Sequence, residues 1–341
     1  MAGLSAAARA RELGAEPAVF EKGDRAGGSM VLSSGVVWRY RTLEGFREEC
    51  PEGDPALQSV IIERLDEAIA WLESLGARVV ARATGNPRTV GMRFDPRSLR
   101  DALVRAAGQI SLSSPFTGSD PVKTVLATGG FPVRLARERG LLLRANRWSE
   151  GDGLDLARAR GATTAGDLGE FYGRAMPAPL DEIAEEDLVR LAQLYGRFAT
   201  VTSEDGDQLF DGPPDWSETD LVQAIARWPG GRAWYVVESS AQRQRIRGQA
   251  VAQMIEAARA AGATVRGDRD RVSVLVQASV TQTLGGLAID ERARVLAEDG
   301  SPLEGLYAAG ADVGGISNGG WSSGLAAALV FGRIAAEEAL S

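Results

Sequence analysis

The sequence predicts an α/β fold in two parts, and three observations lead to this expectation. The chain has 341 residues, which fits one large α/β domain or two lobes that share a cleft. Amphipathic helix patterns alternate with short apolar segments that are typical of buried strands. Glycine accounts for 41 of the 341 residues, above the usual share of roughly 7%, and many glycines stand in pairs beside these patterns. Such pairs indicate either plain turns or a long ligand that runs close to the backbone.

The helices and strands are expected in a regular order along the chain. Apolar residues recur at helical spacing, often up to a glycine that ends the run, over residues 3–14, 54–75, 95–107, 153–160, 185–198, 241–261 and 323–340. Short buried strands are expected at residues 17–21 and 122–127. Residues 164–235 are acidic, aromatic and rich in proline, so we expect them to form a smaller lobe whose tryptophans lie mainly in the core or at an interface.

Composition excludes several classes of protein. The 38 basic and 46 acidic residues give a net charge of −8, which disfavours binding to nucleic acid or to an anionic membrane surface. The chain has no histidine, so histidine-based catalysis and histidine-bound metals are not expected. Cys50 is the one cysteine, so neither an internal disulfide nor a metal-binding thiolate cluster is expected. We expect a protein of the reducing cytoplasm.

Residues 1–21 fit the second half of a βαβ nucleotide-binding unit. In the motif G-x-G-x-x-G, the last three positions match Met1, Ala2 and Gly3, at the start of a helix whose N-terminus favours a pyrophosphate. Glu21 ends the following strand and is 18 residues beyond Gly3, close to the spacing of about 20 for the acid that binds the ribose. The alternative is an ordinary N-terminal helix.

The first strand of that unit and its first two glycines do not precede Gly3 in this sequence. We therefore expect that the chain is truncated at its N-terminus, by about a dozen residues, and that Met1 is an internal methionine. The upstream reading frame tests this hypothesis, and a stop codon directly before Met1 would contradict it.

Several short motifs follow one another along nearly the whole chain: Glu21-Lys22-Gly23, Gly27-Gly28-Ser29, Ser33-Ser34-Gly35, residues 125–131 (VLATGGF), residues 149–162 (SEGDG to GA), residues 281–290 (TQTLGGLAID), residues 305–312 (GLYAAGAD) and residues 331–336 (FGRIAA). With these motifs the sequence resembles the FAD-binding fumarate reductase/succinate dehydrogenase flavoprotein family, which includes 3-ketosteroid dehydrogenases. Each motif alone is weak, but they stand in the family's order, which makes the resemblance specific.

The resemblance implies a discontinuous Rossmann-like FAD-binding domain, α/β in class, with a smaller α+β cap domain. The implied domains are residues 1–163, 164–239 for the cap, and 240–341. The cofactor is expected to be non-covalent FAD, because family members that attach FAD covalently use a histidine. The residues implied to bind it are Ala2, Gly3, Glu21, Lys22, Gly27, Gly28, Ser29, Ser33, Ser34, Gly35, Thr128, Gly129, Gly130, Asp152, Gly310, Asp312, Ser323, Gly324 and Leu325.

Some of these roles have plain structural alternatives. Asp312 is expected to accept a ribityl hydroxyl, but it is alternatively a helix-capping or loop acid. Ser323 and Gly324 are expected to begin a helix that points at the pyrimidine edge of the flavin and stabilises negative charge there. The alternative for Ser323 is an ordinary N-cap.

Tyr172 and Arg174 are the expected catalytic residues. They stand where family members pass from the FAD domain to the cap, and a phenol beside a guanidinium is suited to transfer a proton near the flavin. The alternative is that Tyr172 packs at a domain joint while Arg174 pairs with an acid such as Glu170. Tyr195, on the periodic segment 185–198, is expected to belong to the core.

The expected reaction is a hydride transfer between flavin N5 and a carbon of a C=C or CH–CH unit next to a carbonyl. The loop 313–321 lacks the histidine and arginine that bind dicarboxylates in fumarate reductases, and Gln208 replaces a further arginine, so a more apolar substrate is expected. The expected partners are this small molecule and an electron acceptor that the sequence does not identify. The alternatives are a degenerate flavoprotein that binds FAD weakly and an NAD(P)-dependent enzyme, the latter disfavoured by the distant Asp312.

Overall fold

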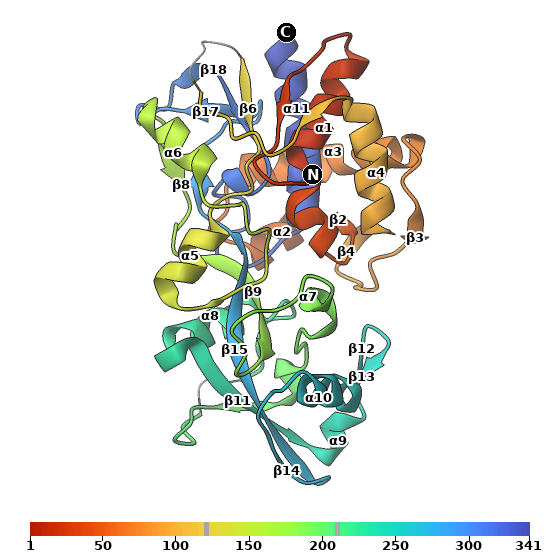
Figure 1. The fold of residues 1–341 in the computed structure, drawn as a ribbon, viewed down its shortest axis with the longest axis vertical. Helices are drawn as coiled ribbons and strands as arrows, with labels where there is room; N and C mark the ends of the chain where they lie inside the picture. The colour runs from red at the N-terminus through yellow and green to blue at the C-terminus, as the bar shows by residue number, and fades with distance from the viewer. Residues whose placement is uncertain (119–122, 209, 211) are drawn as a thin grey trace. The chain divides into compact units, whose positions relative to one another are not determined.

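The computed structural model describes residues 1–118, 123–208, 210 and 212–341, and these residues form two compact units (Figure 1). Unit 1 comprises Met1–Phe131, Asn146–Glu170 and Gln282–Ser341, and unit 2 comprises Pro132–Ala145 and Phe171–Thr281. The mixed α/β architecture confirms the predicted fold class. These units divide the chain at other points than the predicted domains do, since residues 240–281 belong to unit 2, and the domains remain a prediction.

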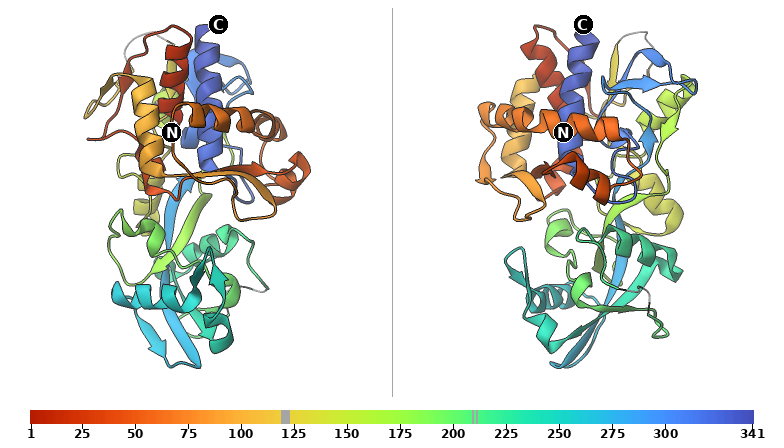
Figure 2. Two further views of the ribbon diagram at one scale, coloured as in Figure 1. Left: turned by 90° about the vertical axis from the view of Figure 1, so that its right-hand side faces the viewer. Right: turned by 180° about the vertical axis from the view of Figure 1, so that it is seen from behind.

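Unit 1 is built around two helices that lie side by side, α1 (Ala2–Glu12) and α11 (Gly324–Leu340) (Figure 2). Both helices are rich in buried alanine, whose small side chain lets the two backbones approach closely. A Cβ on Gly332 would lie 2.6 Å from the carbonyl oxygen of Ala2, which is closer than real Cβ atoms come. The other helices of this unit are α2 (Leu43–Glu49), α3 (Pro55–Ser74), α4 (Pro96–Ala107) and α6 (Asp152–Ala159).

Sequence signals explain where several of these helices begin. Asp54 caps α3 by accepting hydrogen bonds from the amides of Ala56 and Leu57. Asp95 caps α4 in the same way, through the amide of Ser98. A proline follows each of these two acids, and its fixed φ suits the first helical position.

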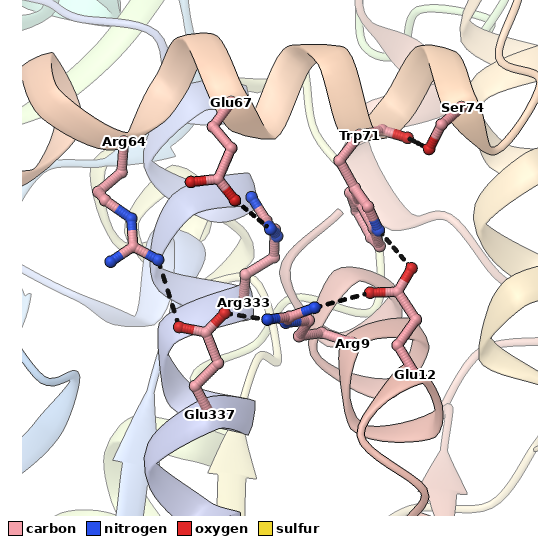
Figure 3. Close-up of polar contacts among 8 residues, drawn as sticks. All are labelled: Arg9, Glu12, Arg64, Glu67, Trp71, Ser74, Arg333 and Glu337. Atoms are coloured by element: carbon pink, nitrogen blue, oxygen red, sulfur yellow. Dashed lines mark hydrogen bonds and ion pairs between the residues drawn. The ribbon is translucent and has the colours of Figure 1, made fainter.

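An ion-pair network joins α1, α3 and α11 (Figure 3). Glu337 of α11 accepts from Arg9 at 2.8 Å and from Arg64 at 3.3 Å, so it connects both neighbouring helices. Arg333, which is buried, pairs with Glu67 at 2.8 Å and lies over the ring of Trp71 at 5.1 Å. The network therefore fixes the packing of the helix that carries the C-terminal motif.

This network predicts a pH-dependent contribution to stability. The hydrogen bond from Arg333 lowers the pKa of Glu67 from its ordinary value of 4.5, so the stabilisation is present above that value and is lost as the pH falls through the lower, folded-state pKa. Because the Glu67 side chain is 64% exposed, we expect Glu67→Gln to lower the free energy of unfolding at neutral pH by only about 0.5 kcal/mol.

Urea unfolding of both proteins across the acid range measures this difference, which should shrink as the pH falls. Glu298→Gln is the matched control, because Glu298 is exposed and has no ion pair among the residues that the structure describes. A difference for Glu67→Gln that does not change with pH would contradict the assignment.

The strands of unit 1 form small sheets. Two pairs of strands are parallel: β1 (Val19–Phe20) with β5 (Ile110–Ser111), and β6 (Thr124–Leu126) with β18 (Pro302–Ala308). Strand β18 also pairs, in the antiparallel direction, with β17 (Arg294–Leu296). An antiparallel sheet contains β2 (Val36–Tyr40), β4 (Thr89–Phe94) and β3 (Val79–Ala81), and β8 (Thr164–Ala165) pairs with β16 (Gly286–Leu287). Strands β1, β6 and β18 end at Phe20, Leu126 and Ala308, one or two residues before the predicted site residues Glu21, Thr128 and Gly310.

Unit 2 contains a six-stranded sheet centred on β15 (Arg271–Thr283), of which residues up to Thr281 belong to this unit. Its other strands are β7 (Leu142–Leu143), β9 (Phe171–Pro177), β10 (Thr200–Thr202), β11 (Arg232–Glu238) and β14 (Val265–Gly267). A separate hairpin joins β12 (Arg245–Ile246) to β13 (Gln249–Ala250). The helices of this unit are α5 (Pro132–Arg139), α7 (Asp187–Arg190), α8 (Thr219–Arg227), α9 (Ser239–Gln242) and α10 (Val251–Ala260).

Two predicted helices are wrong in part. The segment 185–198 contains the short helix α7 and a 3-10 turn at Gly196–Phe198 instead of one continuous helix, although Tyr195 is fully buried as expected. The segment 241–261 is not one helix, because the β12–β13 hairpin separates the end of the short helix α9 from α10, which begins at Val251. The predicted strand 122–127 corresponds to β6, and its first residue lies outside the described residues.

Candidate functional site

The predicted cofactor residues of unit 1 follow one another through direct contacts, beginning at the end of β1. The carboxylate of Glu21 accepts a hydrogen bond from the amide of Gly23 at 2.7 Å. The ammonium group of Lys22 donates to Glu150 at 2.6 Å and to Asp152 at 2.8 Å. These ion pairs connect the segment after β1 to the first turn of α6, as the motifs 21–23 and 149–153 would require if they bind one ligand.

The next contacts join the Gly27-Gly28-Ser29 segment to the segment that precedes α6. The Ser29 hydroxyl accepts a hydrogen bond from the amide of Asn146 at 2.9 Å. Asn146 in turn accepts from the amide of Ser149 at 3.1 Å. A Cβ on Gly129 would lie 2.5 Å from the Ser149 hydroxyl, so the end of β6 reaches this segment only with a glycine there.

Asp312 connects the ends of the two parallel strands β6 and β18. Its carboxylate accepts from the amide of Thr128, from the Thr128 hydroxyl at 2.7 Å and from the amide of Gly129 at 3.0 Å. Burial raises the pKa of Asp312, and these hydrogen bonds oppose that effect. The carboxylate therefore fixes the strand ends on which its predicted partners lie, and its contact with a ribityl hydroxyl remains a prediction.

Gly130 continues the sequence of contacts towards α11. A Cβ at this position would lie 2.5 Å from the carbonyl oxygen of Ala311 and 2.6 Å from the Thr283 hydroxyl. Its φ of 68° lies in the left-handed region, so side chains are disfavoured there for conformational as well as steric reasons. The backbone can thus bend at the strand end while three segments meet.

Thr283 lies in a pocket beside the start of α11. This small pocket, of about 10 Å³ and partly open to solvent, is lined by Gln282, Thr283, Leu284, Gly310, Val313, Ile316, Ser317, Gly324 and Ala327. The Thr283 hydroxyl is completely buried and has no hydrogen-bond partner among the residues that the structure describes. An unpartnered buried hydroxyl costs free energy, so it favours a ligand with a polar edge at this point.

The first turn of α11 borders the same pocket. Ser323 is the N-cap, and its hydroxyl accepts from the amide of Ala326 at 3.3 Å, so the structural alternative for this residue describes its observed contact. Gly324 lines the pocket and Leu325 follows it in the first turn. The free amides and positive end of a 17-residue helix therefore adjoin the space where the flavin pyrimidine is expected.

These observations fit FAD in unit 1. An extended dinucleotide needs close backbone approach at several points and polar groups between them, and the contacts from Glu21 through Gly129 to Gly324 provide both. Ser29 and Asn146 would hold the pyrophosphate region, Thr128 and Gly130 the ribityl region, and Thr283 with the α11 terminus the flavin. The individual roles remain predictions.

Five predicted cofactor residues, Ala2, Gly3, Ser33, Ser34 and Gly35, lie outside this set of contacts. Close packing explains the two glycines among them. The Ser33 hydroxyl donates to the carbonyl oxygen of Met30 and accepts from Gly35, while a Cβ on Gly35 would collide with the carbonyl of Phe94 in β4. A Cβ on Gly3 would lie 3.3 Å from the Cβ of Ala127. Ala2 is buried beneath α11, and Ser34 is half-buried.

The expected catalytic residues Tyr172 and Arg174 lie on β9 in unit 2. The Arg174 guanidinium lies over the Tyr172 ring, 5.0 Å from its centre, and the catalytic role of the two residues remains a prediction. Arg174 also donates to the carbonyl oxygen of Ser217. Glu170, the alternative partner, instead accepts hydrogen bonds from Asn318 at 2.5 Å and Gly319 at 2.8 Å, within unit 1.

The sequence prediction missed Asn146, Ser149, Gln282 and Thr283. Ser149 and the two residues of β15 belong to motifs that the sequence displays, so they could have been nominated with their neighbours. Nothing in the sequence shows that the Thr283 hydroxyl is left without a partner, because that depends on residues distant in the chain.

No helix of the described residues is long and apolar enough to cross a membrane. The expected cytoplasmic location remains a prediction.

Comparisons with known proteins identify the family of the chain. Residues 1–119 and 111–324 match the family model described as the FAD binding domain. The chain is 24% identical over 438 aligned residues to a probable fumarate reductase of Shewanella frigidimarina, covering 99% of this chain and 73% of that protein. A segment of 65 residues is 51% identical to the NADH:acrylate oxidoreductase of Vibrio harveyi and covers 18% of this chain and 6% of that protein.

Solved structures show the same fold. The open conformation of a flavocytochrome c3 fumarate reductase superposes with a TM-score of 0.71 at 22% identity, covering 100% of this chain and 77% of that one. A 3-ketosteroid dehydrogenase from Rhodococcus jostii gives a TM-score of 0.70 at 16% identity, covering 100% of this chain and 95% of that one. With the family match over most of its length, the chain therefore belongs to the FAD binding domain family and is an FAD-dependent oxidoreductase of that family.

Proposed function

We propose that this protein transfers a hydride between flavin N5 and a carbon of a C=C or CH–CH unit that stands next to a carbonyl, on a fairly apolar substrate that is not a dicarboxylate. The relatives are named for fumarate, acrylate and 3-ketosteroids, and each of these molecules has a carbonyl beside such a unit. The loop 313–321 offers no cationic side chain for a second carboxylate.

The observation that carries the proposal is the continuous set of contacts in unit 1 that ends at the unpartnered Thr283 hydroxyl. When bound there, FAD supplies a two-electron hydride acceptor or donor. The protein's own groups then orient it: Thr283 offers a hydrogen bond, and the start of α11 favours negative charge at the edge that it faces. Tyr172 is proposed to transfer the proton and Arg174 to hold the phenol in place.

A half-reaction tests the proposal. The purified holoenzyme is reduced photochemically without oxygen and mixed with benzylideneacetone, cinnamate or fumarate, while the flavin absorption is followed. Reoxidation by either apolar probe, faster than by fumarate, is the expected result. Reoxidation by fumarate alone, or by none of the three, would overturn the proposed substrate class.

Thr283→Val tests the flavin contact separately from turnover. In the apoprotein the variant should be as stable as the wild type or more so, because it removes a buried hydroxyl that has no partner. FAD affinity should fall by about tenfold, since the same hydroxyl is expected to bond the cofactor. Thermal unfolding of the apoprotein and titration with FAD measure the two effects.

Thr89→Val is the matched control. Thr89 is equally buried in unit 1, but its hydroxyl donates to Thr84 at 2.8 Å. This variant should therefore be less stable while FAD affinity is unchanged. Equal FAD affinity in wild type and Thr283→Val would contradict the assigned contact.

A further inference from the structure

Arg144 is a partly buried arginine of unit 2 whose hydrogen bonds, within the described part of the chain, go to uncharged groups. It directly follows β7, and its amide donates to the carbonyl oxygen of Val280 at 2.8 Å, which extends the pairing with β15. Its guanidinium donates from Nε to the carbonyl oxygen of Leu188 at 2.7 Å and from Nη1 to the Thr281 hydroxyl at 3.0 Å. These two bonds fix the plane of the guanidinium.

The charge of Arg144 is not matched by an acid. Among the described residues, no carboxylate forms an ion pair with it, and the charged or titratable groups that act on it are Tyr172, Arg174 and Arg247. Burial lowers the pKa of Arg144 to about 10, and the two other arginines add to this effect while the Tyr172 phenol opposes it. A buried guanidinium among other cations is costly, and an anion placed beside it would remove that cost.

Arg174, the neighbouring arginine, differs in this respect. It is 6% exposed, donates to the carbonyl oxygen of Ser217 and is faced by Glu218, an acid that is 3% exposed. Its charge is thus opposed inside the unit. Arg144, by contrast, has no acid beside it among the described residues, and the Tyr172 phenol that is proposed to transfer the proton is one of the groups that act on it.

We propose that Arg144 binds the carboxylate group of the substrate, so that the carbonyl next to the reacting C=C or CH–CH unit is that of a single carboxylate. This inference rests on the proposed function and narrows its substrate class to apolar monocarboxylates. Nη2 has no hydrogen-bond partner among the described residues, and a carboxylate oxygen is a suitable acceptor for it. One unmatched guanidinium fits one carboxylate, whereas a dicarboxylate would leave its second charge unmatched.

Calorimetric binding to the oxidised holoenzyme tests the inference without turnover. The probes are cinnamate and its neutral methyl ester, which share the apolar ring and the C=C bond. Wild type should bind cinnamate about tenfold more tightly than the ester, and Arg144→Gln should remove this preference. Arg144→Lys, which keeps the charge but loses the planar fork, should retain part of it.

Arg190→Gln is the matched control, because it removes one positive charge from an exposed ion pair with Asp187 in the same unit. It should keep the full preference for cinnamate. Equal binding of the two probes by wild type, binding of neither, or equal loss in both glutamine variants would overturn the inference.

If Arg144→Gln does not fold, as judged by circular dichroism, the preference for cinnamate in wild type and in Arg144→Lys decides whether the inference holds. Selective cinnamate binding without flavin reoxidation would leave the carboxylate site standing and contradict the proposed reaction.

Discussion

Gly130→Ala is expected to lower the affinity for FAD by about tenfold to a hundredfold. The added Cβ would lie within 2.6 Å of both the Ala311 carbonyl oxygen and the Thr283 hydroxyl, and at least the first of these is backbone that must move. The strand ends that carry Asp312 and Thr128 would separate, and the site that they are proposed to form would be lost. Titration of the apoprotein with FAD measures the change.

Gly161→Ala provides the matched control for this prediction. Gly161 also has a positive φ, of 90°, but a Cβ there would meet no atom within 4 Å. Both variants carry the conformational cost of alanine in the left-handed region, roughly 1–2 kcal/mol, so only the steric effect at the site differs. Unchanged FAD affinity in Gly130→Ala, or an equal loss in both variants, would contradict the proposed site.

Tyr172→Phe is expected to reduce turnover by about a hundredfold or more while FAD remains bound. The substitution keeps the ring beneath the Arg174 guanidinium and removes only the hydroxyl that is proposed to transfer the proton. The turnover number, the flavin content and the pH profile of the variant should be measured together. A general acid or base that has been lost should also remove one limb of that profile.

Tyr195→Phe separates a chemical role from a structural one. The Tyr195 hydroxyl donates to Gln193 at 2.8 Å in the core of unit 2, and burial raises the pKa of Tyr195. Its loss should therefore lower stability by about 1 kcal/mol and leave turnover unchanged. Equal turnover in wild type and Tyr172→Phe would show that another group transfers the proton.

The sequence predicted the helices whose ends carry their own signals. Asp54 and Asp95 each precede a proline and cap a helix, and both helices lie within one residue of their predicted range. The motifs that bring Thr128, Gly129 and Asp312 together were also recognisable, because parallel strands end at one edge of a sheet and place such residues together.

The failures have physical causes. In the segment 241–261, Arg247 and Gly248 form a two-residue turn in which both φ angles are positive, 51° and 86°. Such a turn is usually signalled by Asn-Gly or Asp-Gly, and arginine gives no such signal. In 185–198, Leu188, Leu191 and Tyr195 are buried by tertiary contacts that do not require a helix, so their spacing alone was misleading.

The partners of the site residues depend on segments far apart in the chain. Among the described residues, Thr283 lacks a hydrogen bond because the segments around Gly310 and Gly324 leave a pocket there. Arg144 lacks an acid in the same part of the chain because the groups near it are Tyr172 and Arg174 of β9 and Arg247 of the β12–β13 turn. Neither fact follows from local pattern. Both depend on which distant segments the fold brings together.

The most direct test of the account is the cofactor content of the purified protein. The chain should be isolated, or reconstituted with FAD, and then denatured, and the released flavin should be identified by chromatography and counted against protein. We expect the released flavin to be FAD itself, not covalently attached, at one molecule per chain. Failure of the folded protein to retain FAD after reconstitution, with no saturable binding on titration, would contradict it.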